Sequence, residues 1–111
     1  EGLSKSNNER IGMNVYDYKK AIQSADKVLV NFNAKWCAPC KKMAPFISQI
    51  EQEMDDSTKL FKVDADAHKS LLKDIEVSEI PTLIIYRKGK EVWKHVGYIE
   101  EKELRKALEK A

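Results

Sequence analysis

The only two cysteines of the chain, Cys37 and Cys40, stand three residues apart in the stretch WCAPCK. Zinc needs about four ligands, and the only histidines, His68 and His95, are distant in sequence from the cysteines and from each other. Covalent haem attachment needs a histidine directly after the second cysteine, and that position is Lys41. A structural disulfide across so short a loop adds little stability. Thiol–disulfide exchange is therefore the favoured chemistry, with no metal and no cofactor.

The pair lies where a predicted strand meets a predicted helix. Residues 27–33, KVLVNFN, are nearly all apolar, which is typical of a strand buried on both faces. A stripe at helical spacing then follows the pair: it consists of Cys40, Met43, Ala44, Ile47, Ile50 and Met54. A thiolate at a helix N-terminus is stabilised by free N–H groups, so the pKa of Cys37 should fall below about 8.5. We expect an accessible nucleophile in Cys37 and a buried resolving thiol in Cys40, with Pro39 restricting the loop.

The other elements predict how the pair is supported. Helices are predicted within residues 15–25, 68–75 and 100–111, a strand at 59–66, and a hairpin at 81–97 that turns at Lys88 and Gly89. This order predicts an α/β fold whose central mixed β-sheet has a parallel part, an antiparallel edge and flanking helices on both faces. Residues 1–13 are predicted to be a flexible polar tail and residues 14–111 to be one domain.

Composition excludes some partners. The chain has 111 residues, with 20 Lys and Arg against 18 Asp and Glu, so its net charge of +2 argues against nucleic acid. No apolar run approaches the roughly 20 residues that span a bilayer, so we expect no membrane insertion. We expect a monomer. Because the sequence begins with Glu1 rather than Met, we expect a periplasmic or secreted mature domain, with a cytoplasmic protein as the alternative.

Several motifs together resemble the thioredoxin family over about residues 14–111. They are WCAPCK, the strand segment KVDAD at 62–66, IPT at 80–82, and Gly97 after the last predicted strand. The resemblance implies the thioredoxin fold, a redox-active disulfide between Cys37 and Cys40, and a cis peptide between Ile80 and Pro81. It also implies a substrate surface, to which Trp36, Ile80, Pro81, Gly97 and Tyr98 contribute.

Three positions bear on how the site works. Ala38 stands where most members of the family have glycine. Asn31 stands where many have a buried aspartate that accepts the proton of the resolving cysteine, and an amide cannot act as a base. Lys62 therefore lacks its usual carboxylate partner, so its amine reaches solvent, takes another partner or loses its proton more readily. We expect the proton of Cys40 to leave through water and the resolving step to be slow.

The leading prediction is a thiol–disulfide oxidoreductase that reduces protein disulfides through Cys37 and Cys40. A reductase or a membrane electron donor would recharge it. The same pair could instead oxidise or isomerise folding secreted proteins, an alternative suggested by Ala38, Asn31 and Lys35. The third alternative is a binding module that uses the fold for docking.

Overall fold

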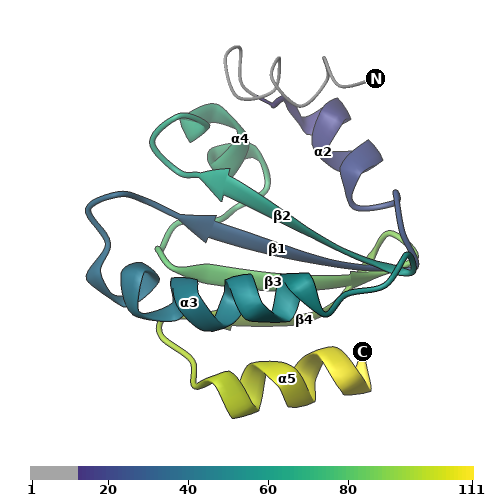
Figure 1. Cartoon of the computed structure of the whole chain (residues 1–111). Helices are drawn as coiled ribbons and strands as arrows, with labels where there is room; N and C mark the ends of the chain where they lie inside the picture. The colour runs from purple at the N-terminus through teal and green to yellow at the C-terminus, as the bar shows by residue number, and fades with distance from the viewer. Residues whose placement is uncertain (1–12) are drawn as a thin grey trace.

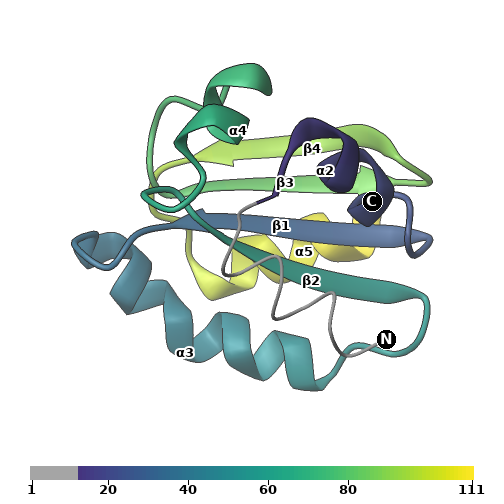
Figure 2. The same cartoon turned by 90° about the horizontal axis from the view of Figure 1, so that it is seen from above.

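The apolar run at residues 27–33 forms an inner strand of the sheet in the computed structural model, which describes residues 13–111. This strand, β1 (Lys27–Asn33), pairs in parallel with β2 (Thr58–Asp64) and antiparallel with β3 (Thr82–Arg87). β4 (Lys90–Val96) pairs antiparallel with β3, which gives the strand order β2-β1-β3-β4 (Figures 1 and 2). The predicted mixed sheet is confirmed.

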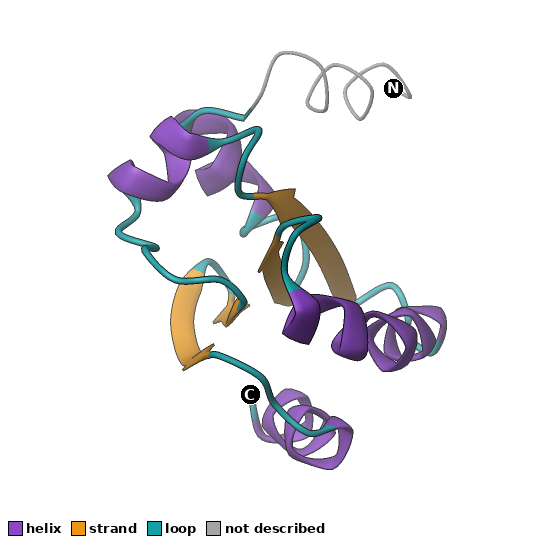
Figure 3. Cartoon of the chain, turned by 90° about the vertical axis from the view of Figure 1, so that its left-hand side faces the viewer, coloured by secondary structure: helices purple, strands orange, loops and turns teal. Residues whose placement is uncertain are grey.

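Within residues 13–111, four helices cover the two faces of this sheet. They are α2 (Val15–Ala21), α3 (Ala38–Gln52), α4 (Lys69–Asp74) and α5 (Glu101–Lys110). α2 and α4 lie on one face, and α3 and α5 lie on the other (Figures 1 and 3). The structure therefore confirms the predicted flanking helices on both faces.

Alternation along β1 explains why both faces are apolar. Val28, Val30 and Phe32 are buried in the core that includes residues of α2 and α4. Leu29 is buried in the second core, against α3 and α5. Successive side chains of a strand point to opposite faces, so Asn31 lies on the α3 face, in line with Leu29. A polar side chain is thus built into the face that supports the cysteine helix.

The antiparallel part of the sheet reaches further than the predicted edge, because β3 already runs antiparallel to β1. The segment between β2 and β3, which contains α4, stays at the end of the sheet where β2 finishes, and β3 starts from that end.

Of the two predictions for the N-terminal residues, the structure tests the helix but not the tail. α2 is shorter than predicted: it ends at Ala21, and the Ser24 hydroxyl donates to the Ala21 carbonyl in the turn that follows. The predicted tail, residues 1–13, lies outside the described residues except for Met13. The division into tail and domain stays a prediction.

Candidate active site

The two cysteines lie where β1 leads into α3. Cys37 is the N-cap of α3, and Cys40 lies within its first turn. Pro39 is also in that first turn, where a backbone N–H has no partner within the helix, so a proline fits without loss. Cys37 and Cys40 form a disulfide, with their Cα atoms 5.3 Å apart. The predicted position of the pair at a helix start is confirmed.

The helix start places one sulfur in a favourable electrostatic position. The backbone N–H of Cys40 donates to the Cys37 Sγ, with 3.2 Å between nitrogen and sulfur. The first turn of α3 contains no acidic residue. Unpaired N–H groups and the positive end of the helix dipole stabilise a thiolate. Cys37 is therefore the sulfur better placed to hold negative charge once the disulfide opens.

The expected difference in access is not found in this disulfide form. Cys40 is buried as predicted, with 9% of its surface exposed, but Cys37 was expected to be accessible and is only 2% exposed. The side chains of Ala34, Cys37 and Cys40 form a small cluster, and Ile80 packs against it. This cover comes from a loop some forty residues away in sequence, which explains why the local pattern missed it.

That loop joins α4 to β3 and contains a cis peptide between Ile80 and Pro81, as the resemblance implied. The Pro81 carbonyl accepts a hydrogen bond from the Gly97 N–H at 2.8 Å. Gly97 has a φ of +95°, a left-handed conformation that favours glycine. The structure thus brings Ile80, Pro81 and Gly97 to the cysteine end of the sheet.

Tyr98 is 41% exposed and lies near the start of the cysteine helix. Together with Ala38, Pro39, Lys42 and Glu100 it lines a hollow of about 460 Å³. Its backbone carbonyl contacts His95 Nε2 at 2.9 Å. The predicted substrate-surface residue Tyr98 is therefore near Ala38 and Pro39, with a hollow between them.

Asn31 and Lys62 lie near Cys40 and differ in how exposed their side chains are. Asn31 is 7% exposed, and it lines a small cavity together with Cys40 and Lys62. The Lys62 side chain is 57% exposed, and its Nζ lies 3.9 Å from the Glu51 carboxylate. Of the outcomes expected for Lys62, the amine reaches solvent and takes another partner.

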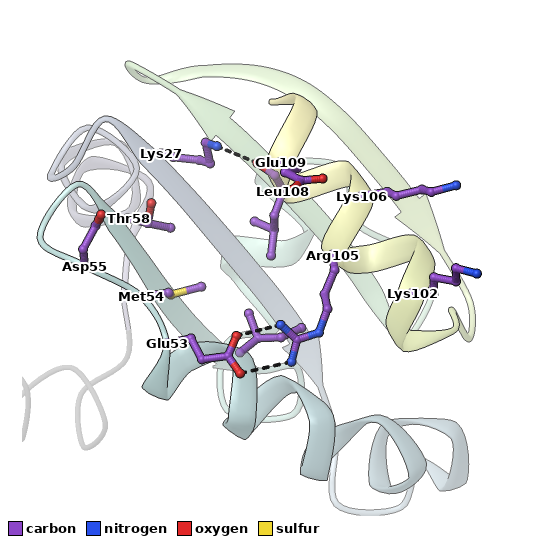
Figure 4. A pocket seen from close by; sticks show the side chains of 11 residues that line it. Lys27, Glu53, Met54, Asp55, Thr58, Lys102, Arg105, Lys106, Leu108 and Glu109 are labelled. Atoms are coloured by element: carbon purple, nitrogen blue, oxygen red, sulfur yellow. Dashed lines mark hydrogen bonds and ion pairs between the residues drawn. The ribbon is translucent and has the colours of Figure 1, made fainter.

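A larger hollow of about 560 Å³ lies between the end of α3 and α5 (Figure 4). It also borders Lys27 and Thr58, which begin β1 and β2, so it is at the end of the sheet away from the cysteines. Arg105 crosses it with two hydrogen bonds to the Glu53 carboxylate, which lower the pKa of Glu53. The Arg105–Glu53 pair in this hollow links the end of α3 to α5.

Among residues 13–111, no three His, Cys, Asp or Glu side chains gather in a way that could hold a metal ion. Nor do the helices within these residues include one whose length and apolar character would allow it to cross a membrane.

Comparison with known proteins identifies the family to which the chain belongs. The family model described as Thioredoxin matches residues 10–110. Thioredoxin-2 of Saccharomyces cerevisiae is 43% identical over 82 residues, covering 73% of this chain and 78% of the relative. Thioredoxin of Staphylococcus epidermidis is 37% identical over 94 residues, covering 85% and 89%. The chain belongs to the thioredoxin family.

Solved thioredoxin structures agree with this assignment. The oxidised form of mitochondrial thioredoxin 3 from Saccharomyces cerevisiae superposes with a TM-score of 0.79 at 28% identity, over 89% of this chain and 92% of that one. A mutant thioredoxin of Halobacterium salinarum gives 0.78 at 28% identity, over 88% and 85%. The chain is accordingly a thiol–disulfide oxidoreductase that reduces protein disulfides, and the oxidant, isomerase and docking alternatives are not favoured.

One contact of this thioredoxin site was not predicted from sequence, namely the bond between the predicted site residue Trp36 and Asp66. Trp36 is 65% exposed, and its indole Nε1–H donates to the Asp66 carboxylate at 3.0 Å. The N–H of Asp66 in turn donates to Asp64 Oδ1 at 2.9 Å, which fixes the turn after β2. The Asp-Ala-Asp sequence just after a strand was a usable signal for this turn, but its contact with Trp36 joins residues 30 positions apart.

Proposed function

We propose that Cys37 attacks the disulfide of a protein substrate and that Cys40 resolves the mixed disulfide so formed. The observation that carries this assignment is the Cys40 N–H directed at the Cys37 Sγ at the start of α3. Because helix N-termini stabilise anionic sulfur, Cys37 is the better nucleophile and also the better leaving group. The two sulfurs then differ in role although both are buried in the disulfide form.

We also propose that the substrate binds in extended form against the loop before β3. Within residues 13–111, no hydrogen bond engages the backbone N–H or C=O of Ile80. Free backbone groups beside a reacting sulfur can pair with an extended chain, which is a common way to bind peptides without demanding a particular sequence. Trp36, Pro81, Gly97 and Tyr98 would line this contact.

Two serine variants test the assignment of roles. The Cys40→Ser protein should accumulate a covalent complex with a protein disulfide substrate, because its Cys37 attacks and nothing resolves the product. The Cys37→Ser protein should accumulate far less. Non-reducing gel electrophoresis after acid quenching measures both. Equal amounts of covalent complex in the two variants would refute the assignment.

Turnover requires that the Cys37–Cys40 disulfide be reduced again, and we propose a reductase or a membrane electron donor for that step. The exchange reaction itself runs in either direction according to the two potentials. Measuring the reduction potential of the pair in thiol buffers tests the direction: a value near about −270 mV supports a reductant, and one near about −120 mV opposes it. Monomeric state and location stay predictions.

A further inference from the structure

His95 is a residue of β4 that no step of the proposed reaction uses. Its Nε2 lies 2.9 Å from the backbone carbonyl of Tyr98. Because a carbonyl oxygen can only accept, Nε2 carries the hydrogen and donates it. The imidazole also stacks on the Trp93 ring, with 5.9 Å between the ring centroids and 11° between the ring planes. Since Trp93 packs against the core beneath α3 and α5, His95 is held on one side and holds Tyr98 on the other.

The segment formed by Gly97 and Tyr98 is fixed from two directions. The Gly97 N–H donates to the Pro81 carbonyl, which ties this segment to the loop before β3. The bond from His95 ties the next residue back to β4. Hydrogen bonds at two consecutive residues leave the backbone little freedom, so Tyr98 has a defined position although it is 41% exposed.

Tyr98 forms part of the wall of the hollow of about 460 Å³ beside the cysteines. Ala38 and Pro39 form the wall on the α3 side, and they are the two residues between Cys37 and Cys40. The segment that joins β4 to α5 passes the same end of α3 (Figure 1). The hollow is therefore continuous with the surface around the disulfide, and a chain bound at the sulfurs can extend into it.

The charges around the hollow indicate which kind of side chain fits it. Its charged lining residues are Lys42 and Glu100, both exposed, and neither forms an ion pair within residues 13–111. One positive and one negative group offset each other, so the hollow favours neither an acidic nor a basic side chain. Its other walls are an alanine, a proline and a tyrosine. A neutral, apolar side chain is the best match, because a charged one would lose water without gaining a partner of its own.

We infer that His95 is a positioning residue for substrate selection: it holds Tyr98 so that the hollow receives a large apolar side chain near the reacting cysteine of the substrate. The inference rests on the attack by Cys37 and the extended substrate proposed above. Successive residues of an extended chain are about 3.3 Å apart, and their side chains alternate between two sides. The second residue before or after the substrate cysteine therefore lies roughly 7 Å along the chain, on the side that faces the hollow.

The test uses short glycine–serine peptides whose single cysteine forms a mixed disulfide with thionitrobenzoate. A phenylalanine, alanine, aspartate or lysine stands two positions before or two positions after that cysteine. Attack by Cys37 on the peptide sulfur releases the coloured thiolate, and stopped-flow absorbance gives the rate constant. The ratio of the rate constants for two peptides at one pH does not depend on the thiolate fraction of Cys37, because that fraction is the same for both.

With the parent protein, we expect the phenylalanine peptide to react about tenfold faster than the alanine peptide at one of the two positions, and the charged peptides to gain much less. Tyr98→Ala should abolish most of this ratio, and Tyr98→Phe should retain it. His95→Ala should lower it about fivefold, roughly the effect of one neutral hydrogen bond. His95→Gln lacks the ring but keeps a side-chain N–H donor, so it should retain most of the ratio. Lys94→Ala, at the neighbouring exposed position of β4, is the matched control.

The inference and the proposed function fail in different ways. If phenylalanine gives no gain at either position, or if a charged residue gains as much, the hollow does not select apolar side chains, and the inference is overturned while the attack by Cys37 stands. If His95→Ala leaves the ratio unchanged, or lowers the rate constants of both peptides equally, His95 has no positioning role. The same follows if His95→Gln loses the ratio as fully as His95→Ala. If Cys37→Ser releases the thiolate as fast as the parent protein, the proposed attack itself is wrong.

Discussion

The hydrogen bond between Trp36 and Asp66 holds an exposed aromatic side chain in place beside the cysteines. We predict that Asp66→Ala weakens the attack of Cys37 on protein disulfides but not on small ones. The indole is 65% exposed, so few packing contacts can replace the lost bond from Nε1 to the carboxylate. A protein substrate needs a fixed surface beside the nucleophile, whereas a small disulfide needs only the sulfur.

The size of the effect follows from the exposure of this bond. Hydrogen bonds to charged groups contribute about 1.5–3 kcal/mol where they are well shielded, and an exposed carboxylate is screened by water, so about 1 kcal/mol is reasonable here. Since 1.4 kcal/mol corresponds to about a tenfold change in a constant, the rate constant on a protein substrate should fall by at most about fivefold. Asp66→Asn retains an acceptor and should lose less.

Stopped-flow measurement of the first step, with insulin and with dithiobis(nitrobenzoate), checks this prediction. Trp36→Phe keeps an aromatic ring but has no indole N–H to donate. Adding Asp66→Ala to Trp36→Phe should therefore cause no further loss. The reasoning from this hydrogen bond is refuted if Asp66→Ala lowers the rate constants with both substrates equally. It is also refuted if adding Asp66→Ala to Trp36→Phe lowers the rate constant on insulin as much as Asp66→Ala does alone.

Four further predictions concern stability, each measured by urea unfolding. The Tyr18 and Tyr86 hydroxyls are bonded at 2.7 Å in the core, so Tyr18→Phe should cost about 1–2 kcal/mol, and the double Phe variant should cost less than the two single variants added; additive costs would contradict this. Burial raises the pKa of both tyrosines, so the folded protein favours the neutral forms and stability should fall as pH rises above about 10; the double Phe variant should lose this dependence. Leu104→Ala should cost about 2–5 kcal/mol, because this side chain is 0% exposed and is the buried anchor of α5; a cost no larger than that of Lys102→Ala would refute it. Gly97→Ala should cost about 1 kcal/mol from backbone strain alone, since an added Cβ meets nothing within 4 Å; a neutral result would mean that the φ relaxes.

Local sequence patterns were enough for the elements that carry the site. The apolar run KVLVNFN gave β1 with its observed bounds, and the paired Lys88 and Gly89 gave the hairpin, where both residues have positive φ. These features depend on burial and turn chemistry within a few residues. The stripe after Cys40 was also mostly correct, but Ala44 is exposed and lines the small cavity next to Asn31 and Cys40.

Contacts between distant segments could not be predicted in this way. The burial of Cys37 depends on Ile80, and the orientation of Trp36 depends on Asp66. The unpaired oxygen of Asn31 becomes visible only once α3 and β2 are placed around it. Each of these results from packing among elements, whereas the pattern of a single segment reports only which of its own faces is apolar.

The hairpin at Lys88 and Gly89 has a practical use. β3 starts beside the end of β1 and returns to its beginning, so the hairpin tip and the disulfide lie at opposite ends of the sheet. The Lys88 N–H bonds the Asp26 carbonyl at 2.8 Å, which anchors the tip, while the side chain is exposed. A tether attached at position 88 would therefore present the thiols outward from an electrode or sensor chip, in one orientation and open to large substrates.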